Sequence, residues 1–337
     1  MDPVFVDVDT GVDDALALLY LLGTPGADLV GIASTGGNVG VEQVCENNLG
    51  LLELCRVGGV PVSKGSGAAL TAPIRSPSKV HGPRGLGYAD LPPSSLELTG
   101  HDAATGWVRA AHAFPGELIG VATGPLTNLA LALRAEPALP TLLRRLVIMG
   151  GSYDHRGNVT PVAEWNMSVD PEAAAEVLAA WSNPPGSLPV LCGLDLTRTV
   201  AMTPDHLVRL AAAAGSTTTP MSASDARGTR STASNPLIRL VEDAMRFYLE
   251  AYHDNGHGFA AHLHDPLAVA AALEPELVTA RPATVDVELT GAHTRGMTVT
   301  DWSKHREPNA LIGVHVDEAA FFDRFVERVG AFARRLA

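Results

Sequence analysis

Short segments rich in β-branched residues alternate with longer segments rich in alanine and leucine through most of this 337-residue sequence. The pattern predicts strands at 4–8, 29–34, 118–122, 146–149 and 189–194. It predicts helices at 13–22, 41–56, 103–114, 126–134 and 171–181. Because parallel strands need a crossover connection, usually a helix, this alternation predicts an α/β fold with a mostly parallel, doubly wound sheet flanked by helices.

The C-terminal part continues this pattern and shows no repeat or linker that would divide the chain. We expect strands at 284–289 and 311–316 and a closing helix at 319–336, so that residues 1–337 form a single large domain. The exception is the stretch 215–235, GSTTTPMSASDARGTRSTASN, which has too few large apolar side chains to bury a face. It is predicted to be a flexible loop. Two interpretations of this loop stay open, an inert connection and a lid over a site.

The composition restricts the partners of the chain. Acidic residues outnumber Lys and Arg by 37 to 24, and the resulting charge of −13 repels nucleic acid and anionic membrane surfaces. No apolar run approaches the ~20 residues that span a bilayer, and no signal-peptide pattern is present. The three cysteines form no CxxC pair and are predicted to be reduced, buried thiols. These features predict a cytoplasmic protein with no nucleic acid or membrane partner.

Four carboxylates follow one another closely where the first predicted strand ends, in the segment DVDTGVDD at 7–14. They are Asp7, Asp9, Asp13 and Asp14. Ligands of open α/β sheets bind outside the carboxyl ends of the strands, and carboxylates this close repel each other unless a cation or a polyhydroxyl ligand satisfies them. A set of oxygen ligands favours Ca²⁺ or Mg²⁺. The alternative is that Asp13 and Asp14 only complement a helix dipole and that Asp7 acts as a cap.

Polar and glycine-rich segments follow several other predicted strands, namely TGGN at 35–38, TGPLTN at 123–128 and GG at 150–151. Glycines allow a ligand to approach the backbone, and free carbonyl groups can bind a hard cation. Farther on, the segment HLHDP at 262–266 places an acid and an imidazole directly before a helix. Asp265 is a candidate metal ligand and His264 a candidate for proton transfer. The spacing of the histidines matches no zinc motif.

Together these motifs resemble the nucleoside hydrolases, specifically the inosine-uridine-preferring type. The resemblance extends over nearly the whole chain and rests on DVDTGVDDALAL (7–18), GN (37–38), HGPRGLG (81–87), VATGPLTNLALALRAEP (121–137), VIMGGSY (147–153), GNVTPVAEWNMSVDPEAA (157–174), GLDLT (193–197) and HDPLAVA (264–270). It implies a Rossmann-like core and Ca²⁺-dependent hydrolysis of the N-glycosidic bond of ribonucleosides to ribose and free base. It also implies a homo-oligomer, dimeric or tetrameric, in nucleoside salvage and catabolism.

The resemblance also assigns roles to individual residues. The calcium ligands would be Asp9, Asp14, the Thr123 carbonyl and Asp265, and Asp9 would also be the general base that takes a proton from a calcium-bound water. His264 would be the acid that protonates the departing base. The substrate-binding residues would be Asp13, Asn38 and Asn166 at the 2′- and 3′-hydroxyls, Asn158, Glu164 and His81 at the 5′-hydroxyl, Met149 at the sugar and Tyr252 at the base. A ribosyl group that loses its base gains oxocarbenium character, and carboxylates stabilise that positive charge.

Two other functions stay open at this point. Asp7-Val8-Asp9 after a first strand is also similar to the haloacid-dehalogenase phosphohydrolases, although Gly11 departs from their pattern and Asp13 and Asp14 would repel a phosphate. A non-catalytic, calcium-dependent nucleoside-binding protein is the second alternative. The preference for purine or pyrimidine bases is also open, because His257 stands where related sequences often carry a tyrosine.

Overall fold

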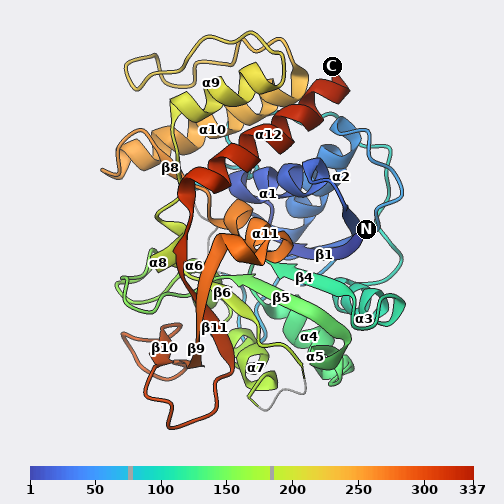
Figure 1. Cartoon of the computed structure of the whole chain (residues 1–337), viewed down its shortest axis with the longest axis vertical. Helices are drawn as coiled ribbons and strands as arrows, with labels where there is room; N and C mark the ends of the chain where they lie inside the picture. Colours follow the sequence, from blue (N-terminus) through green and yellow to red (C-terminus); the bar gives the residue numbers. More distant parts are fainter. Residues whose placement is uncertain (75–78, 183–185) are drawn as a thin grey trace.

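A large sheet runs through the computed structural model, which describes residues 1–74, 79–182 and 186–337 (Figure 1). Within these residues the sheet has nine strands in the order β10-β9-β11-β6-β5-β4-β1-β2-β3. The strands are β1 (Asp2–Val8), β2 (Ala27–Ser34), β3 (Val62–Lys64), β4 (Leu118–Ala122), β5 (Leu143–Met149), β6 (Val190–Cys192), β9 (Val278–Val287), β10 (Thr298–Asp301) and β11 (Ala310–Val316). A separate antiparallel pair is formed by β7 (Ala201–Met202) and β8 (Ala261–His262).

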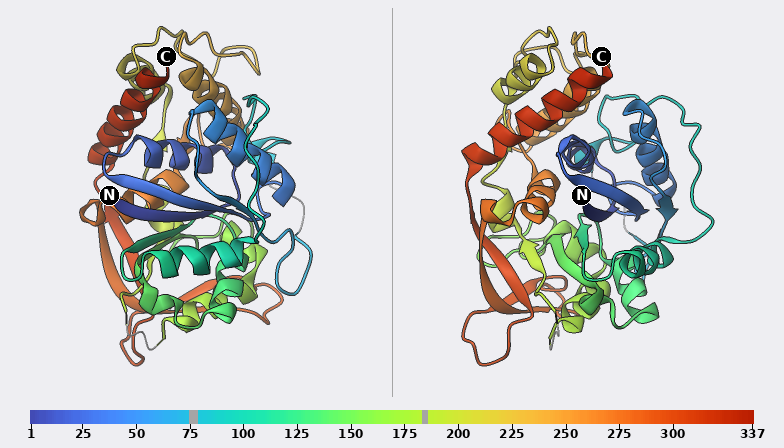
Figure 2. Two further views of the ribbon diagram at one scale, coloured as in Figure 1. Left: turned by 90° about the vertical axis from the view of Figure 1, so that its right-hand side faces the viewer. Right: turned by 45° about the vertical axis from the view of Figure 1, so that its right-hand side comes forward.

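Helices cover both faces of this sheet (Figures 1 and 2). They are α1 (Val12–Gly23), α2 (Val41–Leu54), α3 (Ala103–Ala113), α4 (Thr127–Ala135), α5 (Leu139–Leu142), α6 (Trp165–Val169), α7 (Pro171–Ala180), α8 (Leu194–Thr197), α9 (Pro204–Ala213), α10 (Pro236–Asp254), α11 (His264–Leu273) and α12 (Glu318–Leu336). Within the described ranges, no helix is both long and apolar enough to cross a membrane.

Side chains alternate across β1 and so contribute to two separate cores. Val4, Val6 and Val8 pack with α1, α10, α11 and α12, whereas Phe5 packs with α3, α4 and α7 on the opposite face. This alternation is the expected period of two for a strand that is buried on both sides. The predicted mostly parallel α/β sheet with helices on both faces is thus confirmed.

The sheet order places a topological switch point between β1 and β4. From β1 the chain continues to β2 and β3 in one direction, whereas β4, β5 and β6 extend in the other. All the pairings from β3 to β6 are parallel, so the carboxyl ends of these strands lie at one edge. In doubly wound folds a crevice opens at such a point and receives the ligand.

Two strands at one side of the sheet run antiparallel to their neighbours. The strand predicted at 284–289 overlaps the second half of β9, which begins at Val278, ends at Val287 and pairs antiparallel with β11. Strand β10 then returns antiparallel beside β9 and forms the edge of the sheet. A short connection suffices between antiparallel neighbours, so no crossover helix precedes β10.

The Ser/Thr-rich loop at 215–235 contains no helix or strand, as predicted, and it lies along α10. Its main anchor is Arg246, a buried side chain of α10. The guanidinium lies 2.9 Å from Asp225 Oδ2, donates to the backbone carbonyls of Ser222 and Ala226, and pairs with Glu250 on the same helix at 2.6 Å. In this conformation a buried ionic contact holds the loop against α10.

The three cysteines are free and buried, as predicted. Burial disfavours the thiolate and raises the pKa of Cys55 and of Cys192 to about 12. These thiols therefore stay protonated and unreactive near neutral pH.

Candidate active site

A cavity of about 390 Å³ opens at the carboxyl-end edge of the sheet, between the N-termini of α1 and α11. Segments that follow β2, β4 and β5 form its walls together with the C-terminal end of α10. The cavity brings together most of the predicted site residues, which are Asp13, Asn38, His81, Thr123, Met149, Asn158, Glu164, Asn166, Tyr252, His264 and Asp265. Among the described residues, the predicted site residues absent from its lining are Asp9 and Asp14, which lie buried behind Asn38 and Thr123.

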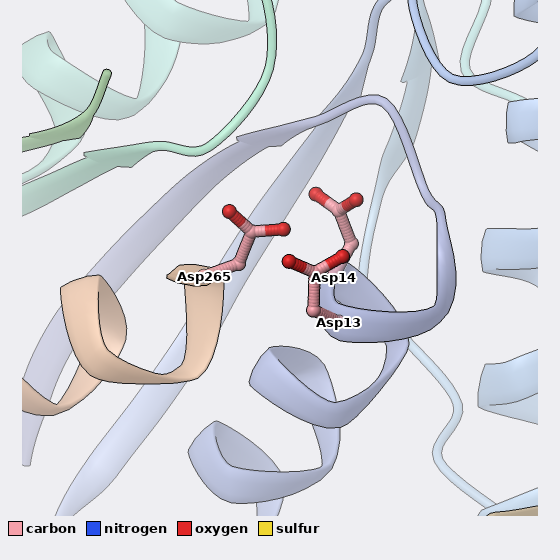
Figure 3. Close-up of side chains that lie close together, drawn as sticks. All are labelled: Asp13, Asp14 and Asp265. Carbon is pink, nitrogen blue, oxygen red and sulfur yellow. The ribbon is translucent and has the colours of Figure 1, made fainter. Parts of the chain in front are cut away.

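Three carboxylates from two helix N-termini converge at the buried end of this cavity (Figure 3). Asp13 and Asp14 stand in the first turn of α1, and Asp265 stands in the first turn of α11. All three side chains are buried, and each offers an oxygen atom within 4.8 Å of the others. The positive ends of two helix dipoles partly compensate the gathered negative charge.

These carboxylates have the properties of a cation site. Burial and the neighbouring Asp14 raise the pKa of Asp13 to about 8, and burial raises the pKa of Asp14 and of Asp265 as well. Within the part of the chain that the structure describes, the buried Oδ1 atom of Asp13 has no hydrogen-bond partner. A hard divalent cation at this place would offset the charge of these buried carboxylates, so the residues present fit such an ion.

Asp9 and Asp14 are held by hydrogen bonds from the surrounding loops. Asp9 Oδ2 accepts from the Asn38 backbone N–H at 2.8 Å, and Asp9 Oδ1 accepts from Asn38 Nδ2 at 3.2 Å. Asp14 accepts from the Gly11 N–H at 2.8 Å and from Thr123 Oγ1 at 2.7 Å. Asp9 is outside the group of three close carboxylates found among the described residues, and Asp13 stands there in its place. The predicted ligand role of Asp9 stays a prediction.

Asp7 does not belong to this cluster, and the interpretation that placed it at a cation site is wrong. Its two carboxylate oxygens accept hydrogen bonds from Trp107 Nε1 at 2.8 Å and from Asn128 Nδ2 at 2.9 Å. Side chains of a strand point alternately to the two faces of the sheet, and this alternation directs Asp7 toward α3 and α4. Strand β1 ends at Val8, so the alternation does not determine the direction of Asp9. Burial raises the pKa of Asp7 to about 6, although these two hydrogen bonds oppose the shift.

Glu164 and Asn166 form a wall that joins the ends of β4 and β5. Glu164 caps α6, and its carboxylate accepts from the backbone N–H groups of Asn166 and Met167 and from that of Gly151. Asn166 Nδ2 donates to the Thr123 carbonyl at 2.6 Å and to the Met149 carbonyl at 3.1 Å. Both side chains are buried, so their polar atoms are fixed before any ligand arrives.

His81 is a neutral side chain of the cavity wall. Its Nδ1 accepts a hydrogen bond from the Val12 N–H at 3.1 Å, so this nitrogen carries no proton. Burial lowers the pKa of His81 to about 4. The 3.7 Å separation between His81 Nδ1 and Asp13 Oδ1 is therefore no ion pair. The free Nε2–H of this tautomer is available as a donor.

His264 lies at the centre of a hydrogen-bonded row of side chains. Its Nδ1 is 2.7 Å from Thr197 Oγ1 at the end of α8, and its Nε2 is 3.2 Å from the Tyr252 hydroxyl of α10. Burial lowers the pKa of His264 well below its usual value, and the nearby imidazole of His262 and guanidinium of Arg198 add to this effect. The imidazole is thus neutral and can donate one hydrogen bond. A resting imidazolium, which the role of proton donor requires, is disfavoured.

Sequence reasoning missed a second set of lining residues, which includes Trp165, Arg198, Tyr248 and His262. Trp165 stands inside the EWN segment, and Tyr248 precedes Tyr252 by one helical turn. The sequence neighbours of these two residues could therefore have identified them as lining residues. Arg198 and His262 are brought together by the pairing of β7 with β8, which no local pattern indicates.

Comparisons with known proteins show the family of the chain. The chain matches the model of the inosine-uridine preferring nucleoside hydrolase family over residues 4–323. It is 35% identical over 334 residues to the pyrimidine-specific ribonucleoside hydrolase RihA of Citrobacter koseri, with 98% of this chain and 99% of that protein covered. RihA of Salmonella typhimurium is 34% identical over the same shares of the two chains.

Solved structures give the same result. The purine-preferring ribonucleoside hydrolase from Gardnerella vaginalis superimposes with a TM-score of 0.87 at 30% identity and 99% coverage of both chains. An inosine-guanosine nucleoside hydrolase superimposes with a TM-score of 0.83 at 28% identity, covering 97% of this chain and 98% of that one. These matches reject the phosphohydrolase alternative. The chain belongs to the inosine-uridine preferring nucleoside hydrolase family and is a ribonucleoside N-glycosyl hydrolase.

Proposed function

We propose that this enzyme hydrolyses ribonucleosides of the uridine and inosine type to ribose and free base in the cavity described above, with a bound Ca²⁺ ion. The observation that carries the proposal is the buried group of Asp13, Asp14 and Asp265 at the closed end of that cavity. A buried negative cluster suits a reaction in which positive charge develops on the sugar. A neutral nucleoside also lacks the phosphate that these carboxylates would repel.

The cation would be held by Asp9, Asp14, the Thr123 carbonyl and Asp265. All of these donors are oxygen atoms, which supports Ca²⁺ over softer metals. When bound, the ion supplies positive charge that offsets the carboxylates and makes a neighbouring water easier to deprotonate.

Asp9 is the proposed general base. Burial and the neighbouring Asp14 raise the pKa of Asp9, and a carboxylate with a higher pKa takes up a proton more readily. The two contacts from Asn38 hold its carboxylate in one orientation. Asp9 thus accepts the proton of the water that attacks the anomeric carbon.

The cavity walls are proposed to bind the ribose hydroxyls. Asp13 and Asn166, with Asn38 beside them, bind the 2′- and 3′-hydroxyls, and the Met149 backbone contacts the sugar. The 5′-hydroxyl is bound by Asn158, Glu164 and His81. The unpartnered Oδ1 of Asp13, in the part of the chain that is described, supports this assignment because a hydroxyl group would give it a donor.

The departing base is proposed to lie against Tyr252 and His264. The short contacts of His264 with Thr197 and Tyr252 keep its ring in place. Because the imidazole is neutral, His264 acts by donating a hydrogen bond to the base, or by passing on a proton through Tyr252, and not as a stored imidazolium. The cytoplasmic setting is supported by the free, buried cysteines. Assembly into dimers or tetramers stays a prediction from the resemblance.

A substrate panel tests the proposed function. Uridine, inosine, cytidine and adenosine are each incubated with the protein and Ca²⁺, and free base and ribose are both quantified. We expect equal amounts of base and ribose from at least one of these nucleosides. Nucleoside binding without release of base from any of the four would favour the non-catalytic alternative and contradict the proposal.

Cation binding is expected to tighten as the pH rises. Asp13 lies beside the proposed ligands Asp14 and Asp265, and its negative charge attracts the ion. In the free protein the pKa of Asp13 is raised to about 8, so below that pH a proton on Asp13 opposes cation binding. Loss of one proton from the site changes the affinity by about tenfold per pH unit in the range where that proton titrates. Calorimetric titration of Ca²⁺ at pH 6.5, 7.5 and 8.5 measures this trend, and Asp13→Asn should reduce its slope. Equal affinities at all three pH values would contradict it.

A further inference from the structure

The guanidinium of Arg198 lines the same cavity and has no assigned role. Arg198 follows α8 directly and precedes β7, whose Ala201 pairs with His262 in β8. The positive charge of Arg198 acts on three other lining residues. After burial, it adds to the lowering of the pKa of His262 and of His264, and it partly offsets the raised pKa of Tyr252. Arg198 is thus a cation on the side of the cavity where the base is proposed to lie.

Arg198 is not neutralised by the protein. Across the described ranges, no carboxylate lies within salt-bridge distance of it, although the chain as a whole carries a charge of −13. Its guanidinium instead contacts the exposed imidazole of His155, with Arg198 Nη1 3.1 Å from His155 Nε2. A half-buried guanidinium without an anionic partner is a binding group for acceptor oxygens that a ligand brings.

A second unpaired polar atom lies on the same wall. The Nδ1 atom of His262 is buried and has no hydrogen-bond partner in the described part of the chain, and the ring stacks edge to face with Tyr252 at 5.3 Å. Buried polar atoms are nearly always satisfied in native proteins, by a ligand where the protein offers nothing. Arg198 and His262 together indicate a polar edge of the substrate at this place.

The depth of the residues fixes which edge this is. The carboxylates that receive the sugar are buried, whereas Arg198 is half-buried and its neighbours His155 and His257 are exposed. With the anomeric carbon at the carboxylates, the base extends from His264 toward Arg198. The edge of the base that lies farthest from the glycosidic bond therefore meets the guanidinium.

We propose that Arg198 donates hydrogen bonds to the carbonyl oxygen on the far edge of the base, O4 of uridine or O6 of inosine, and so selects these bases over cytidine and adenosine. The inference rests on the proposed function and names its specificity-determining residue. When the C1′–N bond breaks, its electron pair passes to the base, and the resulting negative charge spreads to that carbonyl oxygen. The attacking water forms the new C1′–O bond and gives a proton to Asp9. The departing base, hydrogen-bonded by His264, takes up its proton through Tyr252 or from solvent.

The electrostatics of this step favour a guanidinium. A charge-assisted hydrogen bond strengthens as the acceptor becomes an anion, so Arg198 stabilises the transition state more than the bound substrate. Cytidine and adenosine present an amino group at the same place. An amino group and a guanidinium are both donors, so neither finds an acceptor when they face each other. This lowers the enzyme's preference for cytidine and adenosine.

The variant Arg198→Gln tests this proposal in the full-length, Ca²⁺-loaded enzyme. We expect kcat/KM for uridine to fall about 10- to 100-fold, the loss that follows from removing one charge-assisted hydrogen bond. The value for cytidine should not fall, because the amino group of cytidine does not accept a hydrogen bond from Arg198. Arg198→Lys keeps the charge and loses the planar fork, so it should recover part of the uridine activity.

Arg156→Gln is the matched control, since it removes the same charge from an exposed position outside the described cavity lining. It should leave the ratio of uridine to cytidine activity unchanged. Equal losses on uridine and cytidine in Arg198→Gln, or no loss on uridine, would overturn the role of Arg198. Absence of base release by the unaltered enzyme from every nucleoside would instead overturn the proposed function.

Discussion

Substitution of Asp9 by asparagine is expected to lower kcat about a thousandfold while the fold is retained, because general-base catalysis commonly contributes factors of this order. Asparagine has nearly the same shape as aspartate and keeps an oxygen for the Asn38 backbone N–H, which now donates to Asp9 at 2.8 Å. Its amide cannot accept a proton from the attacking water. Steady-state release of base, together with a thermal unfolding curve, measures the two effects separately.

Asp7→Asn is the matched control, because the two positions lie two residues apart and differ in surroundings. Both oxygens of Asp7 accept from side-chain donors, Trp107 and Asn128, on the far face of the sheet. The amide nitrogen of an asparagine would face one of these donors, which should cost about 1–3 kcal/mol of folding free energy. Turnover per folded molecule should persist. Near-normal turnover in Asp9→Asn, in contrast, would remove Asp9 as the base.

The central strands and the first helix were predictable because their patterns are local. A strand buried on both faces has an apolar run, and β1, β4 and β5 all show one before a glycine-rich turn. The long helix α10 was missed, although Asn235 caps it and Pro236 occupies its first position. The antiparallel direction of β9 and β10 depends on pairing between distant segments, which composition and spacing do not determine.

The carboxylate side of the cavity was also predictable, because parallel strands bring their ends to one edge. Asn38, Thr123 and Met149 each follow or end such a strand, and all three line the cavity. The base side comes from α8, α10 and β8, whose relative placement is tertiary. Periodicity shows that Tyr248 and Tyr252 share a face of α10, but only the packed structure shows that this face reaches the cavity.

Burial changes the meaning of the acidic charge that the sequence displays. Counting residues shows that the chain is acidic, and spacing shows that some acids are close. Desolvation raises the pKa of Asp13 and of Asp265. Ionised carboxylates at this depth are therefore more stable with a bound cation than without one. Desolvation equally keeps His81 and His264 neutral, which assigns the positive charge on the base side to Arg198.

Gly37→Ala is expected to lower kcat/KM about a hundredfold, although residue 37 carries no functional group. A Cβ atom on this residue would lie 2.0 Å from Asp9 Oδ2 and 2.8 Å from Asp9 Cγ. Asp9 is only 1% exposed, and its carboxylate accepts two hydrogen bonds from Asn38, the residue that follows Gly37. The side chains of Asp9 and Asn38 therefore cannot move independently. The carboxylate or the whole 35–38 turn must shift, and a displacement near 1 Å in a reacting group costs about this factor.

The control for Gly37→Ala is Gly40→Ala, three residues farther along the same segment. The nearest atom to a Cβ at this position is Glu42 Oε2 at 3.9 Å, so activity and stability should stay unchanged. Gly37→Ala should also cost about 1–3 kcal/mol of folding free energy, as overpacking of buried sites does. Rates measured at saturating Ca²⁺ separate misplacement of Asp9 from weaker cation binding. Because the change adds one methyl group and leaves every proposed catalytic side chain in the sequence, near-normal activity would show that the position of Asp9 does not limit the reaction.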